Sequence, residues 1–464
     1  MKALAGTLIV GLAIAGCAGP RSQTPVAAAV APPPAWRTAL GNGQPIRADW
    51  WVAFGDPVLT ELVERALTNN PDLSAAAARV EEARAQERLS RAQLLPNISA
   101  GAGASEARAL DPFGNAETSP GAQPTIEASY DIDLFGRLRA ANAATRAQLL
   151  ASEGARDTVR LGIVSSVATG YITLRALDSR LLVARDTLAA RGEALRIARR
   201  RAETGYTSRL ELHQAEGEYH ATEQLIPQAE LSIERQENAL RVLLGDVPAT
   251  VMRGVALENF ATPAIPDGLP ADLLRRRPDL YQAEQNLVAA DRSLDSARRA
   301  FLPNISLTGS VGLVISTLLP GSDSVGVFSI GGSILQPIFD GGRLRAQQGI
   351  AASRRDQAAF AYRRAALNAF REVDDSLTGV LRSGQQAVAL AGQRDALAAA
   401  LRNASNRYRA GYSSYLDQLD TQRGLLTAEL ALVQARADRL NAYVTLYQAF
   451  GGGWSSDDVR ATSR

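Results

Sequence analysis

Cysteine, lysine, histidine and aromatic residues are all scarce in this chain of 464 residues. It contains one cysteine, two histidines and a single lysine, Lys2, so nearly every cation is an arginine. A single cysteine excludes a disulfide within the chain, and a net charge of +2 provides no field for nucleic acid. Aromatic residues make up only 5%, whereas hydrophobic residues reach 46% because alanine and leucine dominate. Small side chains at this density are typical of closely packed helices.

The sequence also lacks the residue clusters that support catalysis or metal binding. His213 and His220 are seven residues apart on one predicted helix, about 10 Å along its axis, which is too far to share a metal without further ligands. No nucleophile lies in a recognisable pattern with a base. We therefore expect no enzymatic activity, no metal and no cofactor apart from a covalent lipid.

The first residues predict export and lipidation. Residues 1–16 combine Lys2 with a short apolar run, which is typical of a signal peptide and too short to span a bilayer. The run ends in Leu-Ala-Ile-Ala-Gly before Cys17, which resembles a bacterial lipobox and implies cleavage before Cys17 and lipidation of that residue. Residues 17–48, rich in proline and alanine, then predict an extended tether. No apolar run of 18 residues follows, so we expect no transmembrane helix.

The strongest signal is an internal duplication. Four short segments recur in the same order at a shift of 206 or 207 positions, which indicates two similar halves. The pairs are Pro71-Asp72-Leu73 with Pro278-Asp279-Leu280, Leu95-Pro96-Asn97-Ile98-Ser99 with Leu302-Pro303-Asn304-Ile305-Ser306, Gly136-Arg137-Leu138-Arg139-Ala140 with Gly342-Arg343-Leu344-Arg345-Ala346, and Gly205-Tyr206 with Gly411-Tyr412.

Each half predicts one helix, two strands and two long helices. In the first half we expect a helix over 72–94 and strands over 98–105 and 125–134, and in the second half strands over 305–314 and 325–337. Apolar and polar residues alternate over 125–134, with three carboxylates on the polar face. This alternation fits either a half-buried strand of a soluble sheet or a transmembrane barrel strand with its acids facing water.

Four strands cannot close a barrel alone. Open sheet edges are not tolerated in lipid, because each unpaired backbone group costs several kcal/mol there. Either the sheet is not in lipid or several chains share one barrel, and three chains would supply about twelve strands.

The helices that follow the strands are unusually long. Residues 136–204 contain no proline, and a helix of that length would reach about 100 Å. A break at Gly205-Tyr206-Thr207-Ser208 precedes a returning helix over 209–244, which Pro227 should kink. The second half repeats this pattern over 345–409 and 415–450. Such hairpins need neighbours along their full length, although a soluble coiled-coil scaffold would show the same pattern here.

Several motifs resemble those of the outer membrane factors of Gram-negative efflux systems, the TolC-like proteins, and most closely their lipoprotein branch of the OprM/NodT type. They are Trp51-Val52-Ala53-Phe54-Gly55-Asp56 with Leu59 and Leu62, Arg277-Pro278-Asp279-Leu280 with Ala283-Glu284, Phe301-Leu302-Pro303-Asn304, Arg407-Tyr408-Arg409-Ala410-Gly411-Tyr412, and Tyr415-Leu416-Asp417-Gln418-Leu419-Asp420-Thr421-Gln422-Arg423. The last segment is the most specific.

The resemblance implies an α+β membrane protein that forms a homotrimer. Four strands per chain would make a 12-stranded β-barrel, and the long helices would continue it as a 12-helix periplasmic α-barrel. The expected divisions are 49–250 for the first repeat, 251–270 for a connector in an equatorial belt, 271–452 for the second repeat and 453–464 for a C-terminal tail.

The resemblance also assigns roles at the hairpin ends. Asp417 and Asp420 share a helix face after the second break, where acids are also favoured simply by the helix dipole. Three copies of one carboxylate around an axis would form a cation-selective ring, and the family's ring matches Asp420. Leu416 matches an apolar constriction, and Arg423 and Arg407 match residues whose ion pairs hold the end closed. The expected adaptor-docking tips are Gly205, Tyr206, Thr207, Ser208, Gly411, Tyr412, Ser413 and Ser414.

The function implied is that of a passive exit duct in a tripartite efflux system of the cell outer membrane. Its expected partners are a periplasmic adaptor (membrane fusion) protein, an inner-membrane pump of the resistance-nodulation-division type, and outer membrane lipid. The alternative is a lipid-anchored periplasmic coiled-coil adaptor or scaffold without a pore, which would have no use for the alternating strands. The sequence identifies neither the cargo nor the particular pump.

Overall fold

The computed structural model describes residues 23–38, 46–110, 113–114, 116–266, 268–316 and 324–456. It divides into two compact units, which are described separately. Among the described residues, the first unit, here the strand unit, lies within 23–29, 78–153 and 282–364, and the second, here the hairpin unit, lies within 30–77, 154–281 and 365–456. Cys17 and the signal peptide lie outside the described residues, as does the end of the expected tail, 457–464.

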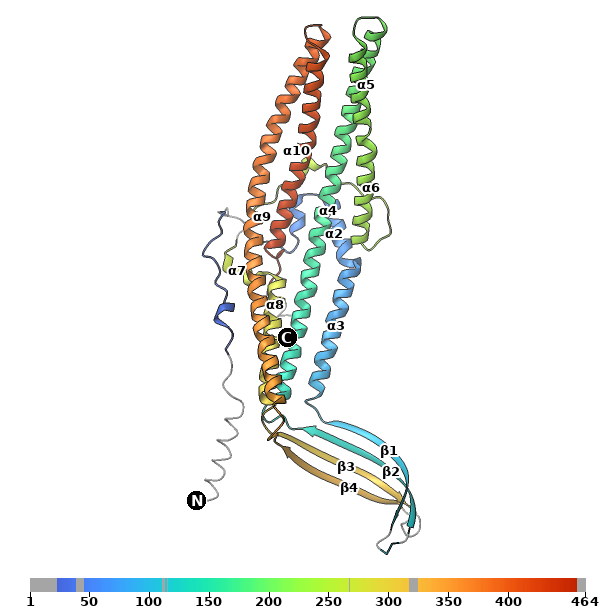
Figure 1. The fold of residues 1–464 in the computed structure, drawn as a ribbon, viewed down its shortest axis with the longest axis vertical. Helices are drawn as coiled ribbons and strands as arrows, with labels where there is room; N and C mark the ends of the chain where they lie inside the picture. The colour runs from blue at the N-terminus through green and yellow to red at the C-terminus, as the bar shows by residue number, and fades with distance from the viewer. Residues whose placement is uncertain are drawn as a thin grey trace. The chain divides into compact units, whose positions relative to one another are not determined.

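The elements occur in the order that the duplication predicts (Figure 1). They are η1 (Val26–Ala28), η2 (Trp50–Phe54), α2 (Pro57–Asn69), α3 (Pro71–Ala92), β1 (Asn97–Leu110), β2 (Ala116–Asp131), α4 (Arg137–Glu203), α5 (Arg209–Glu223), α6 (Leu225–Leu243), η3 (Leu257–Asn259), α7 (Pro270–Arg276), α8 (Pro278–Arg299), β3 (Asn304–Ser316), β4 (Ser324–Leu335), α9 (Arg343–Arg409) and α10 (Tyr415–Ala449).

The four strands form one antiparallel sheet in the order β1-β2-β3-β4. Its register places apolar residues opposite one another, with Ile126 beside Val311 and Tyr130 beside Leu307. Glu127 lies beside Ser310 on the other face, because strand residues alternate between faces. The expected alternation over the first part of 125–134 is therefore confirmed.

The predicted end of that strand is wrong. β2 stops at Asp131 because Asp133 caps the start of α4. The carboxylate of Asp133 accepts hydrogen bonds from the backbone N–H groups of Leu138 (3.0 Å) and Arg139 (2.8 Å). Asp340 does the same for α9 through Gly342 and Leu344, and these bonds lower the pKa of its carboxyl group. Both aspartates satisfy N–H groups that a helix start leaves without partners.

β1 and β2 are also longer than expected. β1 continues to Leu110 and β2 begins at Ala116, so both extend toward the turn. Alanine and glycine are frequent in β1, and β2 contains Pro120 and Pro124, which disfavour strand assignments from sequence.

The long helices are confirmed. α4 and α9 each contain 67 residues, which corresponds to about 100 Å of helix. The returning helix of the first half breaks at Gln224, between α5 and α6. Pro227 lies three residues later and has no N–H to donate to the carbonyl of Glu223, so the predicted kink has its expected cause.

No helix in the described part of the chain is both long enough and apolar enough to cross a bilayer.

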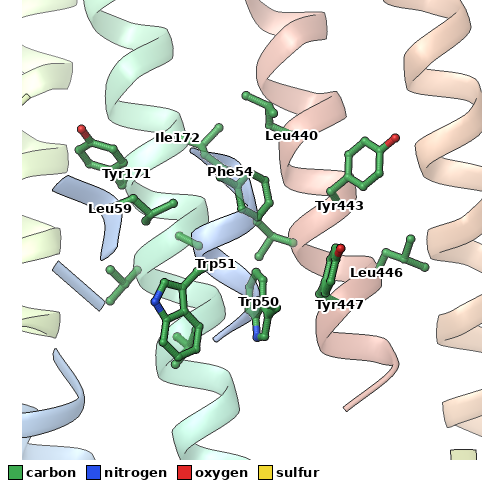
Figure 2. Close-up of a cluster of buried hydrophobic side chains, with 14 of the residues drawn as sticks. Trp50, Trp51, Phe54, Leu59, Tyr171, Ile172, Leu440, Tyr443, Leu446 and Tyr447 are labelled. Atoms are coloured by element: carbon green, nitrogen blue, oxygen red, sulfur yellow. The ribbon is translucent and has the colours of Figure 1, made fainter. Parts of the chain in front are cut away.

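The core of the hairpin unit surrounds the segment that carries the tryptophan-rich motif (Figure 2). Phe54 and Leu59 are fully buried between Tyr171 and Ile172 of α4 and the aromatic residues of α10. The rings of Trp50 and Tyr447 stack with their centroids 5.4 Å apart. Burial of these large side chains, each worth about 1.5–3 kcal/mol, fixes the N-terminal segment against both hairpins.

Candidate functional site at the hairpin ends

Both hairpin turns have the same backbone geometry. Gly205 and Gly411 adopt left-handed conformations, with φ of 74° and 80°, which favour glycine at the end of a helix. Tyr206 N–H then donates to the carbonyl of Arg201, and Tyr412 N–H donates to that of Arg407, both at 2.8 Å. The two tyrosine side chains remain exposed. The predicted docking residues therefore form two matching turns at the ends of the hairpins.

The predicted gate residues follow the second turn on α10. Leu416 is 57% exposed despite its apolar side chain, and Asp417 and Asp420 are exposed beside it. Arg423 lies less than one helical turn beyond Asp420. Arg407 is exposed near the end of α9. Four of these five residues thus belong to the first turns of α10, and Arg407 comes from the preceding helix.

Arg423 joins this group to the other hairpin. Its Nε donates to Glu218 Oε1 of α5 at 2.8 Å. Glu218 Oε2 in turn pairs with Arg191 Nη1 of α4 at 2.7 Å. The side chain of Glu218 is 11% exposed and that of Arg191 is 5% exposed. Burial lowers the pKa of Arg191, although Glu218 opposes that shift. One carboxylate therefore holds two guanidinium groups, one buried within its own hairpin and one on the hairpin of the second half.

A second link lies closer to the turns. The hydroxyl of Tyr408 donates to Glu211 of α5, and burial together with this carboxylate raises the pKa of Tyr408. The guanidinium of Arg201 lies 4.7 Å from the centroid of the Tyr408 ring, within the range of a cation–π contact. Tyr415 packs against Tyr408 with ring centroids 5.6 Å apart. A small apolar cluster surrounds both tyrosines: Leu195, Ala198, Ala215 and Leu419, with Leu212 and Tyr219 at its edge.

Most of these partners were not predicted from the sequence. The sequence pointed to Arg423, but not to Glu218, Arg191 or Glu211. The available signal was the position of charged and aromatic residues within two turns of each glycine break, but the sequence does not indicate how the hairpins face each other.

Metal ligands do not cluster in the described part of the chain, where no group of three or more histidine, cysteine, aspartate or glutamate side chains could hold an ion. His213 pairs with Glu216 (3.1 Å) and His220 with Glu223 (2.9 Å), each with a neighbour on its own helix.

A single antiparallel sheet followed by paired helical hairpins of this length defines a class of outer membrane channel. The fold is similar to the outer-membrane channel OprN, with a TM-score of 0.86, 29% identity and coverage of 94% of this chain and 99% of that one. It is also similar to the open state of the MtrE outer membrane channel of Neisseria gonorrhoeae, with a TM-score of 0.81, 32% identity and coverage of 94% and 98%.

The sequence assigns the family. The outer membrane efflux protein model matches residues 62–246 and 269–452, and the chain belongs to this family. It is 34% identical over 461 residues to the pyoverdine export outer membrane protein OpmQ of Pseudomonas putida, covering 97% of each chain. It is 36% identical over 410 residues to the solvent efflux pump outer membrane protein SrpC of the same species, covering 87% of each.

The function follows from this membership. The protein is an outer membrane efflux channel that extends into the periplasm and serves as an exit duct. The alternative of a periplasmic scaffold without a pore is not supported, because the relatives and the structures that match nearly the whole chain are outer membrane efflux proteins and channels.

Proposed function

We propose that three copies of this chain form one closed duct that conducts substrates passively from a periplasmic adaptor and an inner-membrane pump to the exterior. The main support for this proposal is that the sheet has two open edges. β1 and β4 lie at its edges, and within the described residues neither has a second strand partner. One face of the sheet is apolar, and open edges are not tolerated in lipid. Pairing β1 of one copy with β4 of the next satisfies both edges.

Three sheets would supply twelve strands, which lies within the range of transmembrane barrels. The exposed apolar residues Ile126, Val311, Phe328 and Ile330 would then face lipid, and Glu127 and Asp131 would face the water-filled lumen. Each chain would contribute four long helical segments to the duct, and three chains would form a 12-helix barrel. Near the strands, α3 and α8 would lie beside the long helices α4 and α9. The repeat boundaries 49–250 and 271–452 are proposed on the same basis.

The gate is proposed at the first turns of α10. Three copies of Asp420 around the axis would form a carboxylate ring that attracts cations, with Asp417 adding to the charge and Leu416 forming an apolar constriction. Arg423 and Arg407 would keep this end narrow. The bond from Arg423 to Glu218 supports this role, because it ties the gate helix to the neighbouring hairpin.

The two turns 205–208 and 411–414 are proposed as the docking surface for the adaptor. Their exposed tyrosines offer six similar contacts in a trimer. The names of the relatives, which include a solvent efflux pump protein and a pyoverdine export protein, support partnership with a pump, and we propose one of the resistance-nodulation-division type. Lipidation of Cys17 would anchor the chain in the membrane.

The assembly can be tested directly. Extraction of the full chain from outer membranes should yield a complex of three copies that dissociates on heating, and its insertion into planar bilayers should give conductance. A monomer confined to the soluble periplasmic fraction would overturn the trimer. A trimer without conductance would overturn the duct but not the assembly.

A further inference from the structure

A cavity of about 300 Å³ lies in the strand unit where the strands meet the helices. Its walls come from the residues that follow β2 and β4, the residues that precede β3, and the first turns of α4 and α9. Three arginines line it: Arg137, Arg299 and Arg343. Arg137 and Arg343 are the first residues of α4 and α9 and occupy equivalent positions in the two repeats. The duplication therefore contributes one cation from each half.

Two of these arginines are available to a ligand. In the described part of the chain, the side chains of Arg137 and Arg343 make no hydrogen bond or ion pair. Arg299 is held in place, because its Nη1 donates to the carbonyl of Gly136 at 2.7 Å. A side chain at residue 136 would place its Cβ 2.8 Å from that nitrogen, so glycine is required there for the arginine to enter.

The nearby acids are engaged mainly by other donors, although the charge of Arg343 also contributes to the lowered pKa of Asp340. The carboxylate of Asp133 lines the cavity but accepts hydrogen bonds from two backbone N–H groups and from the side chain of Arg139. Asp340 accepts hydrogen bonds from the backbone N–H groups of Gly342 and Leu344 at the start of α9. These caps also occupy N–H groups at both helix starts, so the guanidinium groups are what remains to attract an anion.

Apolar side chains line another part of the cavity, beside the polar Asn304 and Gln347. Leu134 and Leu335 line it and are 61% and 68% exposed, and Phe135 adds a half-buried ring. Just beyond them, Ile338 and Phe339 are 95% and 92% exposed. Cations beside exposed apolar side chains match a ligand that has a charged head and an apolar body.

We propose that Arg137, Arg299 and Arg343 bind the phosphate group of a glycerophospholipid in the periplasmic leaflet of the outer membrane. Guanidinium groups bind phosphate oxygens through paired, charge-assisted hydrogen bonds. The acyl chains lie against Leu134, Phe135 and Leu335. This proposal rests on the proposed function, since it requires the sheet to cross the membrane so that the strand ends meet the headgroups. Basic pockets at that depth are suited to lipid headgroups.

The test uses the full chain purified in detergent, with native mass spectrometry to count bound lipid. The probe is dioleoylphosphatidylglycerol, and dioleoylglycerol, which lacks the phosphate, is the comparison. Arginines near a membrane surface contribute about fivefold each to affinity for an anionic lipid, so the double variant Arg137→Gln/Arg343→Gln should bind the phospholipid about 25-fold more weakly. The control is Arg345→Gln. Arg345 is exposed and lies on α9 like Arg343, but it does not line the cavity, so this variant should bind the phospholipid like the wild type.

Each result has a defined meaning. Equal binding of phosphatidylglycerol by the double variant and the wild type, or equal binding of dioleoylglycerol and the phospholipid, overturns the proposal. Displacement of the lipid by inorganic phosphate at the same phosphate concentration shows a free-anion site and also overturns it. If the double variant does not assemble, Arg137→Lys/Arg343→Lys keeps the charge but loses the paired geometry, and it should show partial loss. Conductance measured in parallel separates the two proposals, because a non-conducting wild type overturns the duct alone.

Discussion

Arg423 on α10 and Glu218 on α5 are 205 positions apart in sequence and are joined by a hydrogen bond of 2.8 Å from Nε to Oε1. The side chain of Glu218 is 11% exposed, whereas that of Arg423 is 57% exposed. The carboxylate therefore lies in the interior of the first hairpin, whereas the guanidinium lies on the exposed side of α10 in the second hairpin. Any movement of α10 away from α5 must break this bond, so the pair couples the proposed gate helix to the rest of the hairpin end.

Arg423→Gln is expected to increase conductance. A partly exposed ion pair contributes up to about 1 kcal/mol, so its loss should raise the open population about fivefold if the pair exists only in the closed form. Single-channel recording in planar bilayers measures this directly.

The matched control for Arg423 is Arg185→Gln. Arg185 of α4 pairs with Glu230 of α6 at 2.8 Å, and both side chains are about half exposed. This pair lies within one hairpin, so its loss should leave the conductance unchanged. Equal effects of the two variants would remove the gate role of Arg423.

Asp420→Asn is expected to weaken the preference for cations. In a trimer the substitution removes three negative charges from one ring, and such rings attract cations electrostatically. Reversal potentials in asymmetric salt and block by a trivalent cation are the measurements. Asp395→Asn on α9, which removes an exposed carboxylate paired with Arg394, is the control. An unchanged reversal potential and unchanged block for Asp420→Asn would exclude the carboxylate ring while leaving the fold intact.

The helices and strands were predictable because glycine and proline residues mark many of their boundaries in the sequence. Gly205 and Gly411 end α4 and α9, and Pro227 marks the break between α5 and α6. Because the two halves are similar, an element predicted in one half was also expected at the equivalent position of the other. The strand ends were less predictable, because Ile132 and Leu134 continue the alternation of β2, although Asp133 between them caps α4.

The contacts at the hairpin ends were not predictable in this way. Arg423 reaches Glu218 only because two hairpins pack side by side, and periodicity does not encode which faces meet. Family resemblance pointed to Arg423 but not to its acceptor. The same holds for Tyr408 and Glu211, whose hydrogen bond joins helices from different halves.

Tyr171→Phe is expected to destabilise the hairpin unit by about 1–2 kcal/mol. The Tyr171 hydroxyl donates to the buried carboxylate of Asp56 (3.2 Å) and accepts from Gly254 N–H (2.8 Å), and burial raises the pKa of the hydroxyl to about 12. The variant leaves the N–H of Gly254 without this acceptor. A lower midpoint of thermal or denaturant unfolding is the measurement.

Tyr443→Phe is the control for Tyr171. Tyr443 is also buried, as Figure 2 shows, but its hydroxyl makes no hydrogen bond within the described residues. Its loss should change the midpoint much less. Equal shifts for the two variants would mean that the Asp56 cluster contributes no more than an ordinary buried ring.

Glu429→Gln is expected to stabilise the protein at neutral pH. Burial raises the pKa of Glu429 above its usual 4.5, Arg394 opposes the shift, and Asp186 adds to it. A raised pKa in the folded state means that stability is fully present below pH 4.5 and decreases as the pH rises through the folded value. The neutral amide avoids that loss, so at pH 7 the unfolding temperature should rise by about 1–2 °C, whereas at pH 4 the variant and the wild type should agree. Glu234→Gln, which removes an exposed carboxylate on α6, is the control for the loss of a negative charge. A gain of equal size at both pH values would show that the amide acts through packing rather than through charge.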